Sequence, residues 1–101
     1  MIRVLEQVTG GVIKRFLDSK GVPKNCPLCS QDEMSISIFD PEGEQAGTGK
    51  APAVRVIHEL PDGTHRGYGE FLRVCLNCGY IHYIRDTEVL AFMDEGGDNE
   101  L

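Results

Sequence analysis

The sequence predicts a small α+β domain in which an N-terminal helix packs on an antiparallel sheet of three or four strands around one metal site. Three observations predict it. Apolar residues recur at helical spacing near the N-terminus, alternate with polar residues in later segments, and four cysteines form two CxxC pairs. A chain of 101 residues can bury one hydrophobic core and is short for two. We therefore expect a single domain over residues 1–93 and an acidic disordered tail over 94–101.

The N-terminal segment has the periodicity of an amphipathic helix, with apolar residues spaced three and four apart. The Gly10-Gly11 pair interrupts this pattern, so Thr9 is expected to N-cap a shorter helix that runs to Ser19. Gly21 suits the left-handed position that follows a helix, and Pro23 prevents the helix from continuing. The helix is therefore expected to deliver the chain directly to the first cysteine pair.

Later segments alternate apolar and polar residues as half-buried strands do. The predicted strands cover residues 34–38, 54–60, 65–74 and 80–85. Leu60–Thr64 has the proline and glycine of a tight hairpin turn. Residues 40–52 are rich in glycine and proline and almost lack apolar residues, which indicates a mobile loop. Residues 89–93 are expected to form a short helix or an edge strand.

All four cysteines belong to pairs with the same spacing. Two residues between the thiols allow both sulfurs of a pair to point into one tight turn, and two such turns can surround one ion. Four sulfurs in a closed tetrahedron match the preference of zinc. We therefore predict that one structural Zn²⁺ is bound by Cys26, Cys29, Cys75 and Cys78. Four thiolates and one Zn²⁺ would move the net charge from −6 to about −8.

Other uses of the cysteines stay open. An iron centre of the rubredoxin type takes the same four sulfurs, and a thioredoxin-like dithiol could use the first pair alone. Two disulfides would require export, but charged residues interrupt the N-terminal apolar segment too early for a signal peptide. We expect a cytoplasmic protein with reduced thiols. No apolar run approaches the roughly 20 residues that cross a membrane, so no membrane association is expected.

The segments Phe16–Cys29 and Val74–Tyr80 resemble those of small bacterial and phage zinc-ribbon proteins. In these proteins a short helix leads into a CPxC knuckle. A CxNCG knuckle follows, and then an apolar strand and a short apolar segment like Val89–Phe92. The resemblance implies a rubredoxin-like antiparallel sheet around one zinc and no particular activity. Ser30 departs from this pattern, because it stands where these proteins usually have glycine.

No catalytic arrangement is evident, so we expect a binding protein and not an enzyme. His58, His65 and His82 are interpreted as ordinary surface or sheet residues, because four thiols already complete the metal site. The Gly47–Lys50 segment lacks the spacing of a phosphate-binding loop. The favoured function is a protein-interaction or regulatory module whose partner is another protein.

A nucleic-acid partner is the alternative. Arginines on the predicted strands, beside tyrosines, could neutralise and stack on a single strand. The candidate residues are Arg55, Arg66, Arg73, Tyr80 and Arg85. The net charge of −6 opposes this interpretation, although four of the 16 acidic residues lie in the predicted tail. A redox protein, based on iron or on a dithiol, is the third possibility.

Overall fold

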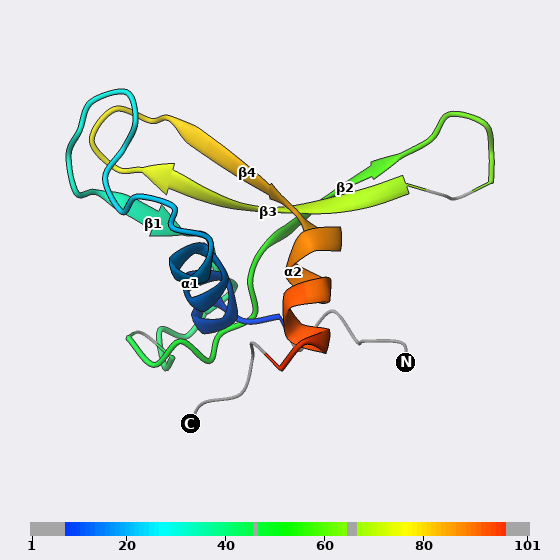
Figure 1. The fold of residues 1–101 in the computed structure, drawn as a ribbon, viewed down its shortest axis with the longest axis horizontal. Coiled ribbons are helices and arrows are strands. Elements are labelled where there is room, and N and C mark those ends of the chain that lie inside the picture. The colour runs from blue at the N-terminus through cyan, green and yellow to red at the C-terminus, as the bar shows by residue number, and fades with distance from the viewer. Residues whose placement is uncertain (1–7, 46, 65–66, 97–101) are drawn as a thin grey trace.

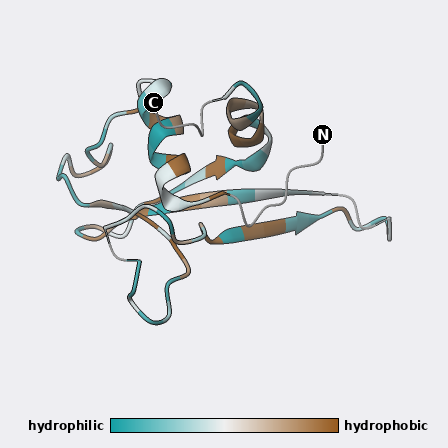
Figure 2. Ribbon diagram, turned by 90° about the horizontal axis from the view of Figure 1, so that it is seen from below, coloured by the Kyte–Doolittle hydropathy of each residue, from teal (hydrophilic) through white to brown (hydrophobic). Residues whose placement is uncertain are grey.

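The computed structural model describes residues 8–45, 47–64 and 67–96, which form one sheet with two helices on the same side (Figures 1 and 2). Along the chain these elements are α1 (Gly10–Ser19), β1 (Met34–Ile36), β2 (Arg55–Glu59), β3 (Gly67–Cys75), β4 (Ile81–Arg85) and α2 (Asp86–Asp94). The four strands pair in an antiparallel manner. The predicted α+β class, with an N-terminal helix on a four-stranded antiparallel sheet, is confirmed.

β3 is the central strand of the sheet. One of its edges pairs with β4 over residues 70–74. The other edge is shared by β2, opposite residues 67–71, and by β1, opposite residues 73–75. Alternation along β3 turns Phe71, Arg73 and Cys75 toward the helices, and all three are buried. The first cysteine of the second pair is therefore the last residue on the buried face of the central strand.

α1 begins and ends where the sequence predicts. The Oγ1 atom of Thr9 accepts a hydrogen bond of 3.2 Å from an amide of the first turn. At the other end Gly21 has a φ of 71°. The amides of Gly21 and Val22 donate to the carbonyls of Asp18 and Leu17 at 3.2 Å and 3.0 Å. This pair of hydrogen bonds is typical of a helix that ends at a left-handed glycine.

The Gly10-Gly11 pair forms the start of α1 and contacts the end of the predicted loop. The amides of Gly10 and Gly11 donate to the carbonyls of Ala51 and Gly49, each at 3.0 Å. A Cβ atom on Gly11 would lie 2.9 Å from the Gly49 carbonyl oxygen, so glycine permits this close approach. The first amides of the helix are already bonded and are not available to a phosphate, which agrees with the missing phosphate-loop spacing.

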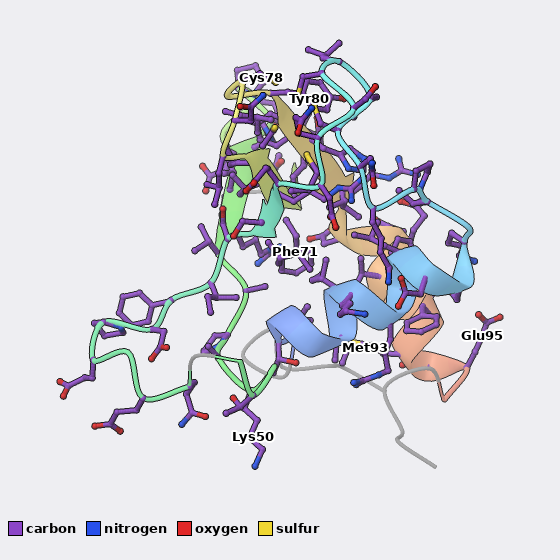
Figure 3. All side chains as sticks on the ribbon, turned by 90° about the vertical axis from the view of Figure 1, so that its left-hand side faces the viewer. Lys50, Phe71, Cys78, Tyr80, Met93 and Glu95 are labelled. Carbon is purple, nitrogen blue, oxygen red and sulfur yellow. The ribbon has the colours of Figure 1, made fainter. Side chains whose placement is uncertain are left out.

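The core lies between the two helices and the β3–β4 pair, where Figure 3 shows Phe71 and Met93. It consists of Val8, Val12, Ile13, Phe16, Leu17, Phe71, Ile84, Val89 and Met93. The rings of Phe16 and Phe92 meet edge to face, with centroids 5.6 Å apart. Val89 and Met93 are buried four residues apart in α2. Of the two alternatives for residues 89–93, the helix is therefore correct.

A partly buried ion pair joins β2 to α2. Asp86 is 6% exposed, and its Oδ2 atom accepts from Nη2 of Arg55 at 2.8 Å and from the Gly69 amide at 2.9 Å. A Cβ atom on Gly69 would lie 2.0 Å from Nε of Arg55. Glycine at this position in β3 therefore leaves room for the guanidinium, although glycine weakens a strand.

Some boundaries differ from the expected ones. β1 ends at Ile36, and Ile38 joins the sheet region only through an isolated bridge to Ala53. α2 extends to Asp94, the first residue of the predicted tail, while residues 97–101 lie outside the described part of the chain. Within residues 8–45, 47–64 and 67–96, no helix is long and apolar enough to cross a membrane.

Candidate metal centre

The two cysteine pairs lie in turns with the same backbone hydrogen bonds. In the first knuckle, residues 26–31, the Cys26 amide donates to the Gln31 carbonyl at 3.0 Å, and the Ser30 amide donates to the Cys26 carbonyl at 2.8 Å. The second knuckle, residues 75–80, repeats both bonds at the same spacing, each at 2.8 Å. The chain therefore contains two copies of one sulfur-presenting turn.

Each knuckle turns out of its cysteine pair through a left-handed residue. Gly79 has a φ of 84°, and Ser30, at the same position of the first knuckle, has a φ of 67°. Ser30 is the one non-glycine residue with positive φ in the described chain. Nδ2 of Asn25 donates to the Ser30 carbonyl at 2.9 Å and helps to hold this conformation. The departure from glycine at Ser30 thus leaves the shape of the knuckle unchanged.

The four sulfurs converge on one point. All four Sγ atoms lie within 4.8 Å of one another. The Cys26–Cys78 and Cys29–Cys75 sulfur pairs are each 3.6 Å apart. Sulfurs around a tetrahedral ion with metal–sulfur bonds of about 2.3 Å are separated by about 3.8 Å, whereas a disulfide has a length of about 2.05 Å. The described cysteines therefore form no disulfide, and their four thiols can bind one metal ion.

Amide donors surround the sulfurs. The Leu28 amide lies 3.4 Å from Sγ of Cys26, and Nδ2 of Asn77 donates across the cluster to Sγ of Cys29 at 3.3 Å. Cys26 and Cys75 are buried, Cys29 is half-buried and Cys78 is exposed. Such donors stabilise a thiolate and not a thiol, so the site is built for negatively charged sulfur.

The thiols differ in acidity. The hydrogen bond from Asn77, followed by that from the Gln31 amide, lowers the pKa of Cys29 to about 6. At Cys78 the Tyr80 amide favours the thiolate, but desolvation and the three other thiols outweigh it and raise the pKa to about 12. Cys29 is therefore a thiolate at neutral pH, and metal binding must displace a proton from Cys78.

The position of the site explains its effect on the fold. The first knuckle follows the end of α1, and the second connects β3 to β4; Figure 3 shows Cys78 and Tyr80 at this end of the sheet. An ion held by all four thiols would join these distant parts of the chain and have no open coordination position. When bound, it would contribute its binding free energy to folding and leave no place for a reactive water.

The residues proposed for nucleic-acid binding do not share one surface. Arg55 and Arg73 lie on the helix-covered face of the sheet. Arg85 is on the opposite face and pairs with Glu88 of α2. Tyr80 belongs to the second knuckle, and Arg66, like His65, lies outside the described residues. A contiguous arginine–tyrosine face is therefore not formed by the described members of this set.

Sequence reasoning missed two polar residues near the site. Asn77 stands between the cysteines of the second pair, and its Nδ2 donates to a sulfur of the first pair. Its place between two cysteines is the one feature of the sequence from which this contact could have been predicted. Nδ1 of His82 accepts from Nε of Arg73 at 2.8 Å. That contact depends on the β3–β4 register, which places these two residues opposite each other. No pattern in the sequence predicts that register.

The chain matches no protein family model, no curated protein and no solved structure. Its class therefore follows from its own geometry. The fold and the site together define a small α+β protein with a four-cysteine, zinc-ribbon-like site that can hold one metal ion.

Proposed function

We propose that this protein binds one structural Zn²⁺ and acts as a protein-interaction module without enzymatic activity. The sulfur geometry supports zinc, because four thiols at tetrahedral spacing form the closed set that structural zinc sites use. A metal with four protein ligands cannot activate a water molecule or bind a substrate directly. The proposed task of the ion is to hold the two knuckles in place.

The observation that supports a protein partner is the exposure of two leucines. Leu28 is 71% exposed and Leu76 is 70% exposed, and each lies between the cysteines of one knuckle. Because the four sulfurs lie within 4.8 Å, the two turns adjoin and present both leucines at the same end of the molecule. Large apolar side chains on rigid, exposed turns are typical of contact residues in protein interfaces.

The sheet face opposite the helices adds further apolar area. Ile81 and Tyr83 of β4 and Tyr68 of β3 are 43%, 48% and 45% exposed. The register places Tyr83 beside Leu72 and Ile81 beside Val74 on this face. An acidic protein with exposed apolar and aromatic side chains is better suited to a protein partner than to the phosphate backbone of a nucleic acid.

Two measurements test the proposal. Metal analysis of the purified protein should give one zinc per chain and a colourless solution, whereas a coloured iron centre would contradict the zinc assignment and support the redox alternative. Affinity capture from the native host should then retain partners with the unmodified chain, and these should be lost with Leu28→Ser, with Leu76→Ser and after chelation. Leu60→Ser is the matched control, because Leu60 is exposed on the hairpin away from the metal.

The nucleic-acid alternative has its own test. Titration of the metal-loaded protein with single-stranded DNA and RNA at two salt concentrations should show no binding under the proposal. Tight binding that weakens steeply with salt, and that is unaffected by the two leucine substitutions, would replace the protein partner with a nucleic acid.

A further inference from the structure

A cavity of about 400 Å³ lies between the first knuckle and the helix-covered face of β3 and β4. Its walls combine apolar groups, such as Pro23, with the sulfur-bearing Cys26 and the polar side chains of Arg73, Tyr80 and His82. None of the described residues that line it is a carboxylate. The cavity therefore presents hydrogen-bond donors, and its described walls contain no carboxylate to accept from them.

Arg73 is a buried cation without an anionic partner. It is 7% exposed, its Nε donates to Nδ1 of His82 at 2.8 Å, and its Nη1 donates to the Pro23 carbonyl at 3.2 Å. No carboxylate of the described residues pairs with it, and neither of these hydrogen bonds goes to a sulfur. Burial of a charge is unfavourable unless it is paired, and a guanidinium has five N–H donors, of which two are used here.

Two further donors have no acceptor in the described structure. Arg73 is always protonated, so its Nε is the donor and Nδ1 of His82 is the acceptor. The neutral imidazole therefore carries its hydrogen on Nε2, for which no acceptor is present among the described residues. The hydroxyl of the half-buried Tyr80 also makes no hydrogen bond with them. Arg73, His82 and Tyr80 are thus three residues with unused donors in the wall of one cavity.

A neighbouring cavity is less suited to an anion. It has a volume of about 260 Å³, is also lined by Arg73, and contains Lys14 and Lys24. However, Asp18 and Asp32 belong to the same walls and would repel a negative group. The cavity beside the first knuckle has no such carboxylate, and there the donors of Tyr80 and His82 stand beside those of Arg73.

We infer that the cavity beside the first knuckle binds a carboxylate group, held by Arg73 with Tyr80 and His82 as additional donors. The planar guanidinium matches the geometry of a carboxylate, and its single charge balances one negative charge. The Cys26 sulfur in the wall, negative when it ligates a metal, disfavours a dianion such as phosphate. The carboxylate belongs to a small free acid or to an acidic polypeptide, so the inference does not depend on the proposed interaction function.

The experiment is a titration of the metal-loaded, ¹⁵N-labelled full chain, followed by the amide and guanidinium resonances. Acetate and an end-blocked tripeptide with a central glutamate should both give saturable shifts at Tyr80, His82 and Nε of Arg73, with dissociation constants in the millimolar range. Inorganic phosphate should bind more weakly. A tripeptide that binds about tenfold tighter than acetate identifies a polypeptide source, and equal affinities identify free acids.

Single substitutions test two of the three donor residues, Tyr80 and Arg73. Tyr80→Phe should weaken acetate binding about fivefold, because it removes one hydrogen bond. Arg73→Lys should weaken it about tenfold, because the planar fork is lost. Arg85→Gln, on the opposite face, is the control and should change nothing. Shifts that increase linearly with acetate, without saturation, overturn the inference. A second combination of results also overturns the inference: the Arg73→Gln variant loses metal, and the unmodified chain binds no carboxylate. The charge of Arg73 would then stabilise only the thiolates.

Discussion

Ser30 and Gly79 occupy the same position of the two knuckles, and both have a left-handed backbone, with φ values of 67° and 84°. In each case the amide of this residue donates to the carbonyl of the first cysteine at 2.8 Å. A serine in this conformation carries a Cβ penalty that glycine avoids.

The Ser30→Gly substitution should therefore stabilise the metal-loaded protein by about 1 kcal/mol, after allowance for the greater entropy of glycine in the unfolded chain. The thermal midpoint should rise by about 4 °C. Gly79→Ser is the matched reverse change and should lower the midpoint. Equal midpoints for all three proteins would show that the left-handed conformation is not costly here.

Asn77→Ala should weaken metal binding about fivefold, because the Nδ2 donor that stabilises the Cys29 thiolate is removed. Competition with a zinc chelator at neutral pH measures this change. Leu76→Ala alters the adjacent exposed residue and should leave the affinity unchanged. A similar loss in both variants would attribute the effect to the turn and not to the hydrogen bond.

Cys75→Ser should abolish metal binding and the sheet together. Cys75 is 1% exposed and ends the central strand, so loss of the ion releases the first knuckle from the end of β3. Far-ultraviolet circular dichroism and metal content on the same sample test this expectation. A native-like amide spectrum for the chelated wild-type chain would contradict it.

Asp86→Ala should lower the free energy of unfolding by about 3 kcal/mol, because the Arg55 guanidinium and the Gly69 amide lose their shared acceptor. Denaturant unfolding in excess zinc gives the value. Glu88→Ala removes an exposed partner of Arg85 and should leave the midpoint nearly unchanged. If both variants lost a comparable free energy of unfolding, the burial of the Asp86 ion pair would not explain the loss in Asp86→Ala.

Stability should also decrease as the pH falls below about 6.5. Desolvation, and then the charge of Arg73, hold the pKa of His82 below its usual 6.5. The unfolded state therefore binds the proton more tightly. The stability contributed by neutral His82 is complete above pH 6.5 and is lost as the pH falls through the lower folded pKa.

The comparison with His82→Asn isolates this effect, since asparagine retains an acceptor near Nδ1 and does not titrate. Thermal midpoints in excess zinc, measured between neutral and mildly acidic pH, should fall more steeply for the unmodified chain than for this variant. Parallel curves would assign the whole pH dependence to the thiols.

Local signals predicted much of this fold. Thr9 marks the start of α1 and Gly21 marks its end, because their side-chain and backbone preferences act within one or two turns. The two CxxC pairs likewise predicted the convergence of four thiols, because a metal-binding turn is encoded in a few adjacent residues. These features depend little on distant parts of the chain.

Other features depend on register and could not be predicted. The nucleic-acid alternative needs Arg55 and Arg73 on an exposed face, but both lie on the helix-covered side of the sheet, where they donate to Asp86 and His82. Alternation alone does not say which face the helices cover, and glycine at position 69 obscured the pattern of β3. The role of Gly69 becomes clear only beside the Arg55 side chain.

The separation of the two knuckles along the chain has a consequence for biosynthesis. Cys75 follows Cys29 by 46 residues, although their sulfurs lie 3.6 Å apart in the folded protein. A ribosome that adds about 5–20 residues per second needs about 2 to 9 seconds to supply the second pair after the first. During this interval the nascent chain carries only the first two of its four thiols. These two thiols can react with metals and oxidants before the second pair has been synthesised. Cys75 belongs both to the central strand and to the four-thiol cluster, so an ion bound there would join two parts of the chain that are synthesised seconds apart.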